Sequence, residues 1–275
     1  MEEFSAMVAP QAAHSLPAMM SLDTRDINRP HHPKHGRIHQ ALTVQDPGEV
    51  VAAHLVSCPH PDIQPPPRMD PTHHYYTQHA AEFFHSTVGV DMAPIRQRFV
   101  ARLPPGGHIL DAGCGSGRDA RAFAEAGFRV TAFDASAELA RLASAHCGFA
   151  VAQRRFEDVD EAAQFDGIWC CASLLHVPLA AMPATLARLW TALRPGGTLY
   201  VSFKHGTGER THGARRFTDA DEAQLRVWFG QLPEVTHPPD VWLTGDQRPD
   251  RSSERWTNAL ATRQRSPDPI DETQG

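Results

Sequence analysis

A run of glycines between acidic residues is the part of this sequence with the clearest capacity for chemistry. Asp111–Asp119 reads DAGCGSGRD, and Asp134 follows 17 residues after the last glycine of the run. Glycines let the backbone turn sharply and let a ligand approach closely, because they have no Cβ. An acid placed after the next strand can accept hydrogen bonds from both hydroxyls of a ribose. The spacing therefore predicts a nucleoside site at Gly113, Gly115, Gly117 and Asp134.

Regular elements must position these residues. The apolar run His108–Gly113 predicts a buried strand, and Arg118–Ala126 predicts a helix that Gly127 stops. The amides at the start of that helix would face a negatively charged ligand group. Phe128–Asp134 predicts a second strand, and Ser136 suits the N-cap of a helix that runs to Ala145.

The same alternation of strands and helices continues along the chain. Two helices precede the first strand and are expected at His79–Phe84 and Met92–Leu103. Further strands are expected at 150–153, 167–171 and 198–203, with helices at 181–193 and 219–229 and a final hairpin-like pair near 239–243 and 255–261. Repeated βα units predict an α/β fold with a parallel sheet covered by helices on both faces.

The glycine spacing argues against a dinucleotide. A G-x-G-x-x-G fingerprint would place its third glycine at position 118, where this chain has the bulky Arg118. Residues 111–119 instead resemble motif I of the class I S-adenosylmethionine-dependent methyltransferases, where the loop cradles the methionine part of the cofactor. The resemblance continues in order through 156–158, 165–177 and 193–199, so that it covers roughly residues 72–263.

This resemblance implies a Rossmann-like, doubly wound, seven-stranded and mostly parallel sheet with an antiparallel last strand. It also implies S-adenosylmethionine as cofactor, and within the family the chain looks most like the small-molecule, tellurite-resistance-type branch. The implied cofactor-binding residues are Tyr76, Asp111, Gly113, Cys114, Gly115, Gly117, Arg118, Asp134, Ala135, Phe156, Glu157, Asp158 and Ser173.

Some of these assignments have alternatives. Asp111 can anchor the loop backbone instead of touching the ligand, and Arg118 can pair with Asp119 or with the methionine carboxylate. Asp158 is chosen as the partner of the adenine amino group, although neighbouring acids make a solvated loop an alternative.

Methyl transfer from a sulfonium needs positioning, desolvation and a deprotonated acceptor, so no protein nucleophile is required. His176 is the candidate base, because it follows the fourth strand and an imidazole titrates near neutrality; a packing role is the alternative. Cationic and aromatic residues on the acceptor side suggest an anionic or aromatic acceptor: Lys204, Arg215, Arg216, Arg255 and Trp256.

The sequence favours the hypothesis that the methyl acceptor is a small molecule. Residues 171–174 read Cys-Ala-Ser-Leu and lack the motifs of amino-directed and base-carbon DNA methyltransferases, and the formal charge of −6 argues against nucleic acid. The alternatives are a tRNA or protein methyltransferase with a basic stripe at 210–216, and a regulatory domain that binds S-adenosylmethionine without catalysis.

Composition divides the chain near residue 70. Residues 1–70 are rich in proline and histidine and lack a helical or strand period, so we expect a mostly disordered extension, and Met69 is a candidate for the natural start. We expect no metal site at His31, His32, His35 and His39, a methyltransferase domain at 71–264 and a flexible tail at 265–275. Five cysteines without CxxC spacing, and no run of about 18 apolar residues, favour a cytoplasmic protein with free thiols and no membrane partner. The oligomeric state cannot be read from these features.

Overall fold

The computed structural model describes residues 70–248, 251 and 253–265. These residues belong to one compact unit, Ile63–Gly275. The predictions for the proline- and histidine-rich extension, its four clustered histidines, Met69 and the tail from residue 266 onward fall outside the described residues.

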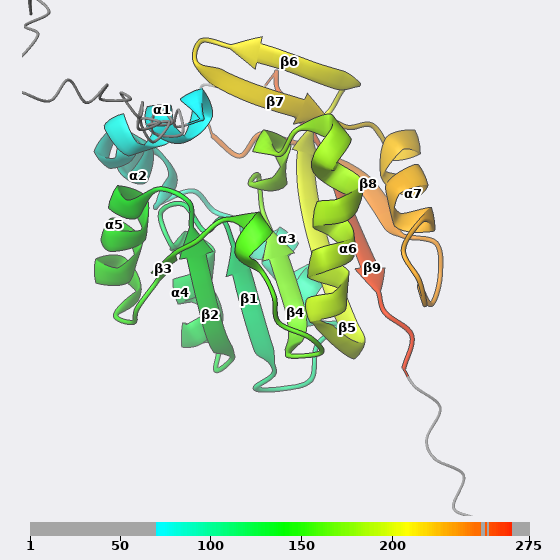
Figure 1. Ribbon diagram of the computed structural model, residues 1–275. Helices are drawn as coiled ribbons and strands as arrows, with labels where there is room; N and C mark the ends of the chain where they lie inside the picture. Colours follow the sequence, from blue (N-terminus) through cyan, green and yellow to red (C-terminus); the bar gives the residue numbers. More distant parts are fainter. Residues whose placement is uncertain (1–69, 249–250, 252, 266–275) are drawn as a thin grey trace, which may run out of the picture. The chain divides into compact units, whose positions relative to one another are not determined.

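A seven-stranded sheet forms the centre of this unit (Figure 1). Its strand order is β3-β2-β1-β4-β5-β9-β8, and β9 alone runs antiparallel to its neighbours. This confirms the predicted doubly wound sheet with an antiparallel last strand. The strands are β1 (His108–Ala112), β2 (Arg129–Asp134), β3 (Ala152–Gln153), β4 (Phe165–Cys170), β5 (Leu193–Lys204), β8 (Asp240–Gly245) and β9 (Arg255–Thr262).

Helices cover both faces of the sheet. In chain order, the helices of the described residues are α1 (Pro71–Gln78), α2 (Ala80–Thr87), α3 (Ala93–Val100), α4 (Arg118–Glu125), α5 (Ala137–Cys147), α6 (Met182–Ala192) and α7 (Glu222–Gly230), of which α1 lies above the strand ends instead of on a face. Short 3₁₀ turns are η1 (Phe156–Asp158), η2 (Leu174–His176) and η3 (Leu179–Ala181).

Each face of the sheet has its own apolar core. On one face, Leu189 and Trp190 of α6 pack with residues of α7 against strands β4 and β5. On the other face, Phe99 of α3 and Phe123 of α4 pack against Trp169 and Tyr200, whose rings stack 3.9 Å apart. Strands β1 and β4 and residues 197–203 of β5 are buried almost throughout, as expected for strands that are covered on both faces.

Two elements above the carboxyl ends of the strands were missed by the sequence analysis. Helix α1 precedes the predicted first helix, and β6 (Gly208–His212) pairs with β7 (Arg215–Asp219) as a separate antiparallel hairpin (Figure 1). The predicted helix 219–229 begins later than expected, because Asp219 ends β7 and Asp221 caps α7 through the amide of Gln224. Both elements lie where parallel sheets bind ligands.

No helix within the described ranges, 70–248, 251 and 253–265, is long and apolar enough to cross a membrane.

Gly167 sets how closely α3 approaches the sheet. A Cβ at this position of β4 would lie 2.6 Å from Phe99 Cζ and 2.8 Å from Leu103 Cδ1. We expect Gly167→Ala to lower the free energy of unfolding by about 1–3 kcal/mol, since the core must shift to admit the methyl group. Urea denaturation measures the change. Gly230→Ala is the matched control, because nothing lies within 4 Å of its Cβ position; a loss of stability at Gly230 as large as at Gly167 would contradict the packing argument.

Candidate active site

The glycine loop after β1 closes onto the carboxylate that ends β2. The amides of Gly113 and Cys114 both donate to the carbonyl of Phe133 at 2.9 Å. The amide of Gly115 donates to Asp134 Oδ2 at 2.9 Å, and the amide of Ser136 donates to Asp134 Oδ1 at 2.9 Å. Each carboxylate oxygen is thus held by one backbone amide and keeps further acceptor capacity for a ligand.

Glycine is required at positions 113 and 117 for two different structural reasons. Gly113 has φ +76°, and a Cβ there would lie 2.6 Å from Ser173 Cβ, whose hydroxyl donates to the carbonyl of Ala112 at 2.7 Å. Gly117 has φ +75° and precedes α4, where a Cβ would lie 2.7 Å from Cys147 Sγ. Gly113 therefore keeps the cradle open beside Ser173, whereas Gly117 lets α4 and α5 approach each other.

Two cavities meet at this loop. The smaller one, about 250 Å³, is lined by the end of β2, the η1 turn and α1. The larger one, about 450 Å³, lies between the loop, α2, β5, the β6–β7 hairpin and the residues around β8 and β9. Residues common to both cavities are Tyr76, Phe83, Gly113, Gly115, Ala172 and His176.

The smaller cavity fits a nucleoside. Asp134 and Ala135 line it from β2, and Phe156 and Glu157 line it from η1. Burial raises the pKa of the Asp134 carboxyl, and the amides of Ser136 and Gly115 partly offset this effect. A buried acceptor whose two oxygens are already oriented suits the two hydroxyls of a ribose.

Asp158 is placed differently from the sequence expectation. Its Oδ2 accepts a hydrogen bond from the amide of Arg155 at 2.9 Å, and Asp158 lines neither cavity. Glu157 is the acid of this turn that reaches the smaller cavity. The side chain of Asp158 stabilises its own 3₁₀ turn, because a carboxylate at the third position of a turn readily accepts the amide that precedes it.

Asp111 provides an unused buried acceptor in the larger cavity. The residue is 2% exposed, and its Oδ2 has no hydrogen-bond partner among the described residues. Burial, with a contribution from the charge of Asp119, raises the pKa of Asp111 well above its ordinary value. A cationic ligand group beside this carboxyl would favour its charged form, as an ammonium does.

Arg118 is held by Asp119. Its Nε and Nη2 donate to the two oxygens of Asp119 at 3.1 and 2.6 Å. Arg96 and the indole of Trp169 donate to the same carboxylate. Burial opposes ionisation of Asp119, but Arg118 and Arg96 outweigh it and hold its pKa below the ordinary value. Arg118 also lines the larger cavity, so the pairing fixes its guanidinium at the cavity wall, where Nη2 lies 3.8 Å from Cys171 Sγ.

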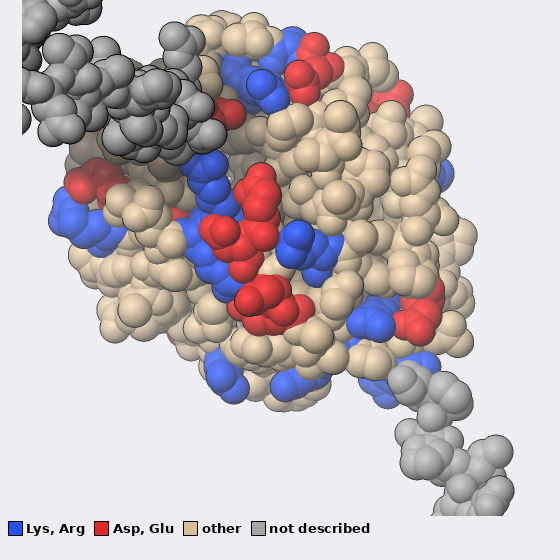
Figure 2. All heavy atoms as spheres, in the orientation of Figure 1, with Lys and Arg blue, Asp and Glu red and all other residues tan. Residues whose placement is uncertain are grey.

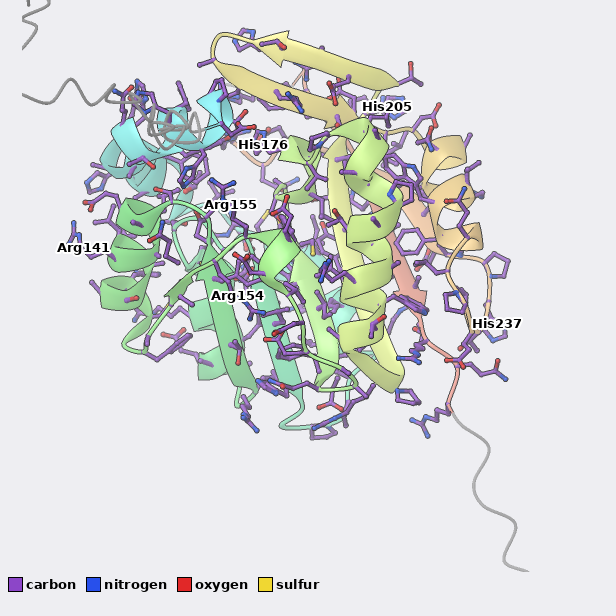
Figure 3. The ribbon with its side chains drawn as sticks, in the orientation of Figure 1. Arg141, Arg154, Arg155, His176, His205 and His237 are labelled. Carbon is purple, nitrogen blue, oxygen red and sulfur yellow. The ribbon has the colours of Figure 1, made fainter. Side chains whose placement is uncertain are left out.

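His176 lies where the two cavities meet, below β7 and close to α1 (Figure 3). Its Nδ1 lies 2.7 Å from the carbonyl of Arg216, and its Nε2 lies 2.8 Å from the hydroxyl of Tyr76. A carbonyl only accepts, so Nδ1 carries the proton and Nε2 accepts from the phenol. Burial lowers the pKa of His176 to about 4, so the ring is neutral at pH 7.

Helix α1 contributes residues that the sequence analysis missed. His73 Nε2 lies 2.5 Å from the carbonyl of Ala135, and the hydroxyl of Thr72 accepts from the amide of Arg216 at 3.0 Å. His73 and Tyr76 both line the smaller cavity. A spacing of three residues places His73 on the same helix face as Tyr76, which the sequence analysis had already named. This spacing could have identified His73 as a further site residue.

The residues suggested for the acceptor side divide between two environments. Lys204, Arg215 and Trp256 line the larger cavity, whereas Arg216 and Arg255 line neither cavity. The structure adds Tyr200 and Asn258 to the wall, joined by a hydrogen bond of 2.8 Å between the phenol and the amide oxygen. Across the ranges that the structure describes, no group of three metal-ligating side chains is found.

Comparison with known proteins agrees with this geometry. A methyltransferase-domain family matches residues 81–238. Ubiquinone biosynthesis O-methyltransferases of Xanthomonas axonopodis pv. citri and Xylella fastidiosa are 40% and 39% identical over 119 residues, which are 40% of this chain. The chain matches about half the length of these relatives, 48% and 47%.

A solved structure supports the fold. The 1,6-didemethyltoxoflavin-N1-methyltransferase of Burkholderia thailandensis, which binds 1,6-didemethyltoxoflavin and S-adenosylhomocysteine, is 25% identical. The match covers 70% of this chain and 87% of that one, with a TM-score of 0.58. With its glycine loop, its sheet order and the family match over more than half of its length, this chain belongs to the class I S-adenosylmethionine-dependent methyltransferases.

Proposed function

We propose that this protein transfers a methyl group from S-adenosylmethionine to a small-molecule acceptor. The proposal depends on the two cavities that meet at the glycine loop. Asp134 lines the smaller cavity and Asp111 lines the larger one. When bound, the cofactor supplies a methyl group already activated by a positive sulfur. The protein has to orient it, exclude water and receive the acceptor.

The residues around the loop fit the three parts of the cofactor. Asp134 accepts hydrogen bonds from the ribose, and Phe156 and Glu157 form the adenine side of the smaller cavity. Asp111, which has an unpartnered buried oxygen, suits the ammonium of the methionine part. Arg118, fixed by Asp119, suits the carboxylate of the same part through a charge-assisted bond.

A small acceptor agrees with the charge distribution better than a nucleic acid. Within the 210–216 segment, Arg210 pairs with Asp219 and Arg216 lies 3.8 Å from Glu209. On the face drawn in Figure 2, basic and acidic groups lie next to each other on a mostly uncharged surface. The names of the relatives also point to small acceptors. One group of relatives acts in ubiquinone biosynthesis, and the solved structure binds 1,6-didemethyltoxoflavin. The acceptor site is then the larger cavity.

We propose that His176 receives the acceptor's proton through Tyr76. The acceptor hydroxyl or amine would give its proton to Tyr76 Oη while the phenol passes its own proton to His176 Nε2, which lies 2.8 Å away. Neutral His176 can accept at pH 7 and holds the proton weakly, so the proton would leave to solvent. The bond from Nδ1 to the Arg216 carbonyl keeps Nε2 facing Tyr76.

The cofactor assignment is tested by Asp134→Ala. We expect the affinity for S-adenosylhomocysteine, measured by calorimetry, to fall about tenfold to a hundredfold, because charge-assisted hydrogen bonds of about 1.5–3 kcal/mol are lost. Glu138→Ala is the control, since this acid lines neither cavity and pairs with Arg141 on the surface of α5. Unchanged affinity in Asp134→Ala would refute the ribose assignment.

The proton path is tested by Tyr76→Phe and His176→Gln, assayed with an acceptor found by a labelled-methyl screen. If the pair removes a proton, kcat should fall by about 10²–10⁴ in both variants. A positioning role alone predicts that KM rises while kcat stays near the wild-type value, and that result would contradict the relay.

Because His176 is buried in its neutral form, its contribution to the free energy of unfolding should depend on pH. Its pKa is about 4 in the folded protein against an ordinary value of 6.5, so between these values the unfolded chain binds more protons. The stabilising contribution is complete above pH 6.5 and is lost as the pH falls toward 4, with a total on the order of 3 kcal/mol.

Urea denaturation of the wild type and His176→Gln at pH 7 and 4.5 measures this contribution as a difference, in which the other titrating groups cancel. We expect the stability advantage of the wild type to shrink by on the order of 2–3 kcal/mol at the lower pH. A difference that does not change with pH would show that the ring is not buried in its neutral form.

A further inference from the structure

The basic side chains of the larger cavity differ in whether an acid neutralises them. Most of them form ion pairs with carboxylates of this chain. These pairs are Arg118 with Asp119, Arg210 with Asp219, Arg248 with Asp246, and Lys204 and Arg251 with Glu254. Each of these cations therefore already has a carboxylate partner without a ligand, although Lys204 and Arg251 share Glu254.

Arg215 is different. Its guanidinium lines the larger cavity and forms no ion pair with an acidic side chain of the described part of the chain. Its Nε is buried and has no hydrogen-bond partner among those residues. The carbon of the guanidinium lies 4.5 Å from the ring centroid of Tyr75 and 5.3 Å from that of Phe217. Stacking on these rings holds the cation in place without neutralising it.

Arg215 lies close to Tyr76 and His176, the two residues of the proposed proton path. It stands at the start of β7, next to Arg216, whose carbonyl accepts from His176. Arg215 interacts with the hydroxyl of Tyr76, and its charge contributes to the environment of His176. Both of these residues line the junction of the two cavities. A ligand group bound to Arg215 is thus close to the junction where the methyl group would be presented.

The apolar part of the cavity wall suits a planar body. Tyr200, Trp256 and Phe217 contribute aromatic surface, and Met92 and Ile95 contribute aliphatic surface. A planar guanidinium matches a carboxylate through two parallel hydrogen bonds. Arg215 offers such a fork without a carboxylate partner among the described residues, and a monoanionic carboxylate matches it in charge and shape.

We propose that Arg215 is the acceptor-recognition residue and that the acceptor is an aromatic or heteroaromatic carboxylic acid. This inference rests on the proposed methyl transfer, since it assigns the larger cavity to the acceptor. The carboxylate pairs with the guanidinium of Arg215, and the ring of the acceptor lies against the aromatic wall. Its hydroxyl or amine then faces Tyr76 and the junction of the cavities.

The experiment uses the full chain loaded with S-adenosylhomocysteine, with benzoate and the neutral benzamide as probes, measured by ligand-observed NMR titration. We expect benzoate to bind at least tenfold more tightly than benzamide. Arg215→Gln should weaken benzoate at least tenfold and leave benzamide unaffected. Arg215→Lys, which keeps the charge but loses the planar fork, should fall between the two. Arg226→Gln is the control, since this exposed arginine of α7 has the same charge and lines neither cavity.

Several outcomes would overturn the inference. These are an absence of benzoate binding, equal affinities for benzoate and benzamide, or unchanged benzoate affinity in Arg215→Gln. Phenyl phosphate serves as a further probe, and tighter binding of it than of benzoate would overturn the assignment of a carboxylate. Failure of the wild type to bind S-adenosylhomocysteine is seen before any probe is added, and it would refute the proposed function itself. Retained binding of S-adenosylhomocysteine by Arg215→Gln shows that the variant is folded.

Discussion

The bond between the glycine loop and Asp134 is the constraint on which the site depends. One carboxylate receives the amide of Gly115 from the loop and the amide of Ser136 from the start of α5. It therefore fixes the ends of two neighbouring strands and the entry to a helix together. Both amides are held by a half-buried acceptor, at a place where unsatisfied polar groups are costly. The same oxygens that shape the loop are then available to a ribose.

Two elements that the sheet does not require close the site above this constraint. Helix α1 reaches Ala135 through His73 and the β6–β7 hairpin through Thr72, while Tyr76 reaches His176. The hairpin in turn holds His176 through a backbone carbonyl. The parallel sheet supplies a general platform for binding the cofactor, whereas the hairpin and α1 shape the cavity that we propose for the acceptor. This division explains why family membership says little about the acceptor.

Burial gives the ionisable groups of the site different roles. Asp119 stays charged because Arg118 and Arg96 surround it, whereas at Asp111 burial outweighs the charge of Arg118 and raises the pKa. His176 is neutral because it is buried and its Nδ1 is committed to a carbonyl. Arg215 remains without an acidic partner among the residues described. The proposed cofactor and acceptor would each bring the charge that the protein lacks at these two positions, at Asp111 and at Arg215.

The order of the βα units and the glycine loop with Asp134 could be predicted from the residues alone, because local periodicity and motif spacing carry that information. The seven-stranded sheet with its antiparallel last strand followed from the resemblance to the family and is confirmed by the structure. It also placed the hairpin-like pair that became β8 and β9. Three results required the folded structure: Asp158 caps its own turn, Gly117 serves helix packing, and Arg215 lacks an acidic partner among the described residues. The results for Gly117 and Arg215 depend on residues distant in sequence, whose positions are set by packing. The partner of Asp158 is local, but which acid of its turn faces the cavity depends on how that turn packs against the rest of the site.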